Sequence, residues 1–143
     1  MEEGAIKFNL HYTRAGLPDS VALDALNHWR SVLRERALIG QDPGRYDGYG
    51  YGNISQRLNS RQAACGQRAF VISGTQTGHL DMLDRQHYTL VETYDTGRNT
   101  VVARGPVKPS SESLTHGMIY DMDEHIHVVL HVHSPAIWRN ATI

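Results

Sequence analysis

The sequence has little of three features that would assign it to a specialised class of protein. It holds one cysteine, Cys65, so an intramolecular disulfide is impossible, as is typical of proteins in a reducing compartment. No apolar run approaches the roughly 18 residues that a membrane-spanning helix needs. The opening residues Met1–Gly4 lack the apolar core of a signal peptide. These absences predict a cytoplasmic protein with no membrane partner.

An excess of charge of either sign is also missing. The 14 Lys and Arg residues are balanced by 15 Asp and Glu residues, which gives a net charge of −1. Without a basic surplus, general electrostatic binding of nucleic acid is not expected. The length of 143 residues, with 40% hydrophobic and 20% charged residues, is typical of one globular domain. We therefore expect a single domain over residues 1–143.

Residues 1–18 show no clear pattern and are interpreted as an N-terminal extension. After Pro18, Asp19 or Ser20 could cap a helix whose apolar residues recur at helical spacing: Val21, Ala25, Leu26, Trp29, Val32 and Leu33. A second helix is predicted after Ser110 or Ser111, with an apolar face formed by Leu114, Met118, Ile119 and Met122. Strands are predicted over residues 54–58, 69–73, 88–93, 100–104 and 128–133. Helices beside a sheet predict an α/β or α+β fold.

The last predicted strand carries two histidines in an alternating pattern. His131 and His133 would share one face, about 6.5–7 Å apart along the strand, where both imidazoles could bind one metal ion. The other face would hold Val128, Leu130 and Val132 against the core. Two histidines that line a polar pocket, or make ordinary hydrogen bonds, explain the pattern equally well. The pair is therefore a candidate metal site.

A second polar group precedes the predicted second helix. Ser110 and Ser111 offer hydroxyls, and the backbone N–H groups at the helix start favour an anion. Glu112 could be a metal ligand or a general base, or it could simply complement the helix dipole. His116 lies one turn later and is a candidate ligand, a partner of a ligand, or a buried packing residue.

Two loops could add to this site. The glycine-rich stretch 48–52 matches no phosphate-loop or dinucleotide pattern, but it leads into Asn53 at the start of a predicted strand. The loop at 75–78 follows another strand and could present N–H groups to an anion.

Taken together, these segments resemble the class II aldolase and adducin head family. The resemblance is carried by residues 51–57, by 70–73 with Thr77, Gly78 and Leu83, by 108–112 with His116 and Tyr120, and by 129–135. Each motif alone is modest, but their order and spacing together are specific. The resemblance runs from about residue 20 onward.

The resemblance implies a three-layer α/β/α sandwich around a mainly antiparallel or mixed sheet, assembled as a homotetramer. It also implies a metal-dependent, aldolase-type lyase that acts on a phosphorylated sugar or a small hydroxy-carbonyl compound. The metal, most commonly zinc, would be bound by His131 and His133, and Glu112 would be the acid/base. The substrate phosphate would be bound by Asn53, Thr77, Gly78, Ser110 and Ser111.

A third metal-binding histidine, which the family places well beyond His133, is not in this sequence. We therefore expect that the C-terminal part of the family domain is missing, and that Glu112, His116, water or a neighbouring chain would complete a metal site. The alternative function is a non-catalytic, adducin-like head that serves as a protein-interaction or oligomerisation module.

Overall fold

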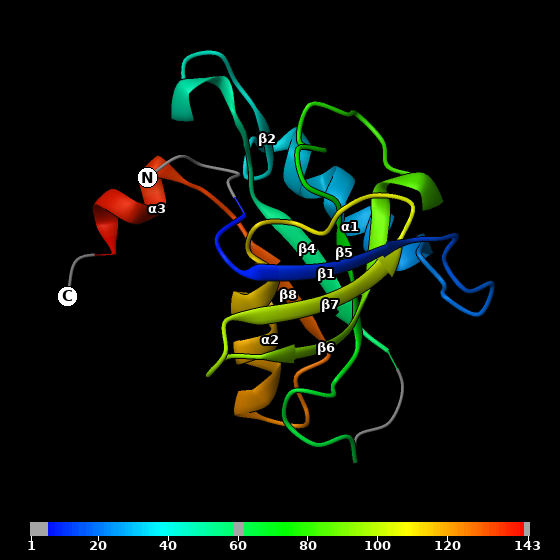
Figure 1. The fold of residues 1–143 in the computed structure, drawn as a ribbon. Helices are drawn as coiled ribbons and strands as arrows, with labels where there is room; N and C mark the ends of the chain where they lie inside the picture. Colours follow the sequence, from blue (N-terminus) through cyan, green and yellow to red (C-terminus); the bar gives the residue numbers. More distant parts are fainter. Residues whose placement is uncertain (1–5, 59–61, 142–143) are drawn as a thin grey trace.

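The computed structural model of the protein describes residues 6–58 and 62–141, which form a mixed six-stranded sheet with few helices (Figure 1). The strands are ordered β1-β7-β6-β5-β4-β8 across the sheet. Their bounds are β1 Asn9–Arg14, β4 Asn53–Arg57, β5 Phe70–Ser73, β6 Tyr88–Asp95, β7 Thr100–Gly105 and β8 Val128–His131. A separate two-stranded sheet pairs β2, Gly40–Gln41, with β3, Gly50–Tyr51. The predicted α/β class is confirmed.

Strand β1 makes the sheet mixed. It pairs in parallel with β7, from Asn9 opposite Thr100 to Arg14 opposite Gly105, whereas the other pairings in the six-stranded sheet are antiparallel. The hydroxyl of Tyr12 donates to the carbonyl of Gly105 at 2.6 Å and fixes this edge. The segment interpreted as an extension thus contributes a strand, and Figure 1 shows it lying along β7.

Helix α1 (Asp24–Glu35) packs beside one of the two hydrophobic clusters. This cluster combines Leu26 of the helix with Ile54, Val71 and Tyr88 of the sheet. The helix begins later than predicted, because the N–H of Val21 donates to the carbonyl of Pro18 and turns the chain around Asp19 and Ser20. The position before the helix is therefore held by Leu23.

Helix α2 (Ser113–Met122) packs against the second cluster, which contains Phe70, Ile72, Tyr94 and Tyr120. Its buried residues are Ser113, His116, Gly117 and Tyr120. A Cβ at Gly117 would lie 2.6 Å from the Tyr94 ring, so only glycine lets the helix approach this closely. The predicted apolar face is wrong in part, since Met118 and Met122 are exposed.

Strand β8 is an edge strand, and its predicted core face is wrong. Val128 and Leu130 are about half exposed, at 49% and 44%, and Trp29 of α1 beside them is also exposed. Val129, on the opposite face, is the buried residue of this strand. Helix α1 contacts β4 but leaves this part of β8 uncovered by the residues described.

The remaining elements are short. The 3-10 turns η1 (Tyr46–Gly48) and η2 (Arg85–His87) precede β3 and β6. Helix α3 (Pro135–Asn140) is capped by the Ser134 hydroxyl, which accepts from the N–H of Ile137, and it stands apart from the sheet (Figure 1). Trp138 on this helix is 83% exposed. Within the described part of the chain, every helix is too short or too polar to cross a membrane.

Candidate functional site

Strand pairing brings Asn53 and His131 together. The two residues are directly opposite in the antiparallel β4–β8 ladder, so their side chains lie on the same face of the sheet. Strand β8 ends at His131, two residues earlier than predicted, and the N–H of His133 donates to the carbonyl of Leu38 at 2.9 Å. The Nε2 atoms of His131 and His133 nevertheless lie 3.1 Å apart.

We call His131 and His133 the histidine pair. Two ligands of a tetrahedral zinc ion at about 2.0–2.1 Å would be roughly 3.3 Å apart, close to the observed spacing. Nδ1 of His131 is buried and has no hydrogen-bond partner among the described residues, whereas a ligating imidazole normally donates its second N–H. In residues 6–58 and 62–141, no group of three or more His, Cys, Asp or Glu side chains could hold a metal. The pair therefore fits a metal as two ligands of an incomplete set.

Aromatic rings enclose His133. The Tyr46 ring meets the imidazole edge-on at 4.8 Å between centroids, and the Tyr51 ring lies at 5.6 Å. The Arg45 guanidinium sits 4.2 Å from the centre of the Tyr51 ring and donates to the Tyr51 hydroxyl at 2.9 Å. These contacts restrict the imidazole to orientations near His131. The sequence analysis did not predict these ring contacts, because Tyr51 lies in the glycine-rich stretch 48–52, which is typical of a flexible turn.

The predicted substrate residues surround one small pocket, which we call the polar pocket. It is lined by Gly50, Gly52, Asn53, residues 74–78, Ser110 and Ser111. The lining includes all five residues predicted to bind phosphate: Asn53, Thr77, Gly78, Ser110 and Ser111. These residues come from three separate segments, namely β4, the loop after β5, and the approach to α2.

Close contact between glycines shapes one wall of the polar pocket. A Cβ at Gly78 would lie 2.2 Å from the carbonyl oxygen of Gly40 and 3.2 Å from the Cα of Gly50. Because backbone lies on the other side, no side chain could move to make room. The 74–78 loop can therefore pack against β2 and β3 only if position 78 is glycine.

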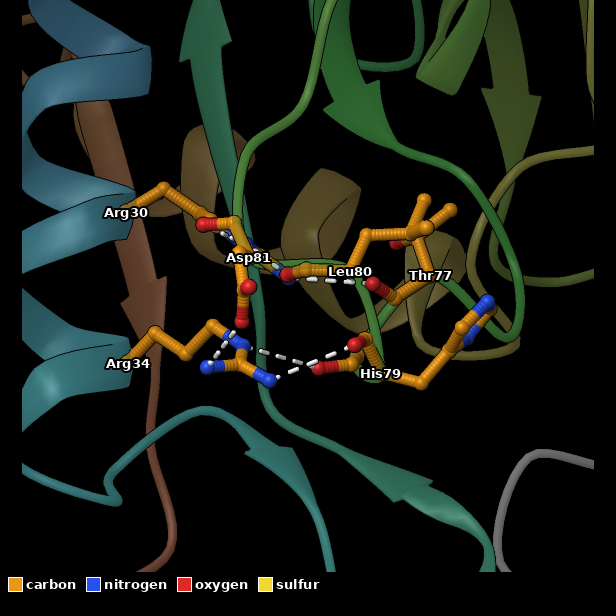
Figure 2. A network of polar contacts seen from close by, with 7 residues as sticks. Arg30, Arg34, Thr77, His79, Leu80 and Asp81 are labelled. Carbon is orange, nitrogen blue, oxygen red and sulfur yellow. Dashed lines mark hydrogen bonds and ion pairs between the residues drawn. The ribbon is translucent and has the colours of Figure 1, made fainter.

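Two arginines of α1 contact this loop and the residues that follow it (Figure 2). The Arg30 side chain is 1% exposed and donates to the carbonyls of Thr77, Leu80 and Asp81 at 3.0, 2.5 and 3.2 Å. Arg34 donates to the carbonyls of Gly78 and His79 and pairs with the Asp81 carboxylate at 2.9 Å. Burial lowers the pKa of the Arg30 guanidinium, as does the nearby charge of Arg34.

The guanidinium of Arg30 thus contacts the same loop that lines the polar pocket. It satisfies the loop carbonyls on its own side and adds positive charge there. Sequence reasoning missed Arg30, although it follows buried Leu26 by four residues and so shares its helical face.

A buried chain of hydrogen bonds supports Asn53. His116 Nε2 lies 2.5 Å from Asn53 Oδ1, and His116 Nδ1 lies 2.7 Å from the Ser55 hydroxyl, which contacts the Tyr120 hydroxyl at 2.7 Å. Burial lowers the pKa of His116 to about 3, with a smaller contribution from His131, and burial raises the pKa of Tyr120. Both ring nitrogens of His116 already have protein partners, so His116 supports Asn53 rather than a metal.

Among the described residues, Glu112 makes its side-chain and N–H hydrogen bonds at the start of α2 and not with the histidine pair. It occupies the position before α2, its N–H donates to the Ser110 hydroxyl at 3.2 Å, and its carboxylate accepts from the Thr115 hydroxyl at 3.3 Å. A carboxylate at this point also complements the helix dipole. The structure therefore places Glu112 next to the polar pocket along the chain, but it does not bring Glu112 into a three-ligand group within the residues described.

Comparison with known proteins identifies the family. The family model described as "Class II Aldolase and Adducin N-terminal domain" matches residues 44–141. Neither a curated protein nor a solved structure gives a match to this chain. The matched segment covers more than half of the sequence and contains the polar pocket and the histidine pair. The chain belongs to the class II aldolase and adducin N-terminal domain family.

Proposed function

We propose that the protein is a metal-dependent, aldolase-type lyase that acts on a phosphorylated sugar or a small hydroxy-carbonyl compound. The observation that supports this proposal most is the β4–β8 register, which sets Asn53 of the polar pocket directly opposite His131 of the histidine pair. A substrate with a phosphate in the pocket would therefore extend its carbon chain toward the two imidazoles.

The polar pocket suits the phosphate of such a substrate. Ser110 and Ser111 lead into the N-terminus of the ten-residue helix α2, where the helix dipole favours negative charge. Asn53 contributes an amide, and the Arg30 guanidinium contacts the 74–78 loop. Binding of the phosphate away from the reacting carbons would hold those carbons in place.

The histidine pair would hold the metal, for which Zn²⁺ is our proposal. Such an ion would act as a Lewis acid toward the negative charge that carbon–carbon cleavage leaves on the hydroxy-carbonyl fragment. His131 and His133 supply two nitrogen donors, so further ligands would come from water, from substrate or from another chain. Glu112 is proposed to move the proton. Aldol cleavage, epimerisation and dehydration use this same arrangement.

The family also suggests a three-layer α/β/α arrangement and a homotetramer with a small-molecule substrate, and the single cysteine suggests a cytoplasmic location. We include these as parts of the same proposal. A site completed by a neighbouring chain would explain why the described residues hold only two of the ligands a metal needs.

A non-catalytic head, used as a protein-interaction or oligomerisation module, is the second candidate. One observation favours it: the described residues place no third His, Cys, Asp or Glu with the histidine pair. A protein that contains no metal and cleaves no sugar phosphate would support this candidate over the lyase.

The experiment is metal analysis of the purified protein after dialysis against zinc. We expect about one zinc ion per chain, and we expect His131→Ala to lose it. His125→Ala is the matched control, because His125 is an exposed histidine bound to Asp123. Zinc retained by His131→Ala, or absent from the unsubstituted protein, would contradict the proposed metal site. Release of an aldehyde or ketone from a panel of sugar phosphates then tests the reaction.

A further inference from the structure

The hydrogen bonds around Asn53 determine which group its amide presents to the polar pocket. Asn53 is 7% exposed and lines this pocket. Its Oδ1 faces Nε2 of His116, and no atom among residues 6–58 and 62–141 accepts a hydrogen bond from its NH₂ group. If the amide were turned over, its oxygen would face the pocket instead, and a carbonyl oxygen repels an anion.

The tautomer of His116 selects between these two orientations. An amide oxygen only accepts hydrogen bonds, so with Oδ1 facing the ring, His116 Nε2 must carry a proton. In the neutral imidazole, Nδ1 then accepts from the Ser55 hydroxyl, and Ser55 accepts from the Tyr120 hydroxyl. In the other tautomer each of these bonds reverses, and the amide NH₂ would face the ring.

We propose that His116 is a positioning residue, which holds the Asn53 amide so that its NH₂ group donates to a phosphate in the polar pocket. This inference rests on the proposed function only for the identity of the anion. His116 itself is 1% exposed and does not line the pocket, so it acts through Asn53. Ser55 and Tyr120, also fully buried, fix the ring from its other side.

The first test reads the tautomer directly. Long-range ¹H–¹⁵N correlation spectra of the folded protein at pH 7 distinguish a protonated from an unprotonated ring nitrogen. We expect His116 to be protonated at Nε2 and unprotonated at Nδ1. A proton on Nδ1 with Nε2 bare would overturn the inference. This measurement needs no ligand, so it is independent of the proposed function.

The second test is a double-mutant cycle with inorganic phosphate as the probe. Phosphate binding is measured from changes in amide chemical shifts at constant ionic strength. Asn53→Ala should weaken phosphate binding about tenfold, as loss of one hydrogen bond to a charged group does. His116→Asn is too short to reach Asn53 and should weaken binding similarly. His116→Gln keeps an amide nitrogen near the position of Nε2 and should stay within about threefold.

The double variant Asn53→Ala with His116→Asn decides between positioning and a general structural role. If His116 acts through Asn53, the double variant binds phosphate as weakly as Asn53→Ala alone. Additive losses, or equal losses in His116→Gln and His116→Asn, would overturn the inference. An unsubstituted protein that does not bind phosphate would instead contradict the proposed substrate class, and the tautomer would still decide the role of His116.

Discussion

The polar pocket and the histidine pair adjoin at Asn53 and His131, yet different amounts of structure hold them. The pocket is enclosed by β4, the 74–78 loop and the approach to α2, and α1 contacts the loop through Arg30. The pair lies where edge strand β8 ends, and the residues after it lead into the short helix α3, which stands apart from the sheet. The polar pocket, which we propose for the anion, is thus enclosed by several described elements, whereas the histidine pair, which we propose for the metal, supplies only two ligands.

The largest expected effect tests how strongly α1 holds the pocket loop. Arg30→Met should lower the free energy of unfolding by about 3–4 kcal/mol, because it leaves three loop carbonyls without their charged donor. Arg34→Met is the matched control from the next turn of the helix. Its bonds to the Gly78 and His79 carbonyls are longer on average and more exposed to water, and its ion-pair partner Asp81 is 89% exposed, so we expect a loss of about 1 kcal/mol or less. Equal effects in urea denaturation would contradict the special role of Arg30.

Gly78 tests the packing of the same loop. Gly78→Ala should cost about 2–3 kcal/mol, because its Cβ would lie 2.2 Å from the backbone oxygen of Gly40. Gly16→Ala adds the same methyl group where no atom lies within 4 Å, and it should change stability by about 0.5 kcal/mol or less. Urea denaturation of both variants checks the difference. A stable Gly78→Ala protein would show that the pocket is less tightly built than we describe.

The buried, neutral His116 should make the free energy of unfolding depend on pH. Its pKa is lowered to about 3 in the folded protein, so below pH 6.5 the unfolded chain binds a proton that the folded chain does not. Stability should therefore fall as pH falls from 6.5 toward 3, by about 2 kcal/mol between pH 7 and pH 5. His116→Gln should remove this contribution. Urea denaturation at several pH values measures it, and identical pH profiles would contradict the assignment.

The smallest expected effect tests whether the histidine pair binds zinc although it is an incomplete set of ligands. Zinc at ten times its dissociation constant should stabilise the protein by about 1.4 kcal/mol, and His133→Ala should abolish this gain. His133→Ala should also leave phosphate binding within about threefold of the unsubstituted protein, because His133 does not line the polar pocket. Thermal unfolding with and without zinc provides the measurement. A zinc effect that persists in His133→Ala would show that the ion binds elsewhere.

The sequence predicted those groups of site residues whose members lie close together along the chain. Alternation along a strand predicted that His131 and His133 lie together, and their Nε2 atoms are 3.1 Å apart although β8 ends at His131. The serines before α2 were found because a helix start is a local pattern. The convergence of Asn53, Thr77 and Ser110 on one pocket was expected only from the family resemblance.

Features that depend on distant partners were missed. Strand β1 alternates only weakly between exposed and half-buried residues, and its partner β7 lies far along the chain, so residues 9–14 gave no strong strand signal. Arg57 is 5% exposed and donates to the carbonyl of Glu124, 67 residues further along the chain, at 2.6 Å. Arg30 was missed for the same reason, since local sequence does not show which carbonyls a buried arginine will meet.

The parallel pairing of β1 with β7 sets an order of events during synthesis. Asn9 pairs with Thr100, so β1 has no partner until 91 further residues have been made. At 5–20 residues per second, a ribosome takes about 5–18 s to supply them. Throughout that interval residues 9–14 remain without their partner strand, and until β1 docks, the outer side of β7 is an open edge that another chain could join. Docking of β1 on β7 is therefore the step that closes this edge in the newly made protein.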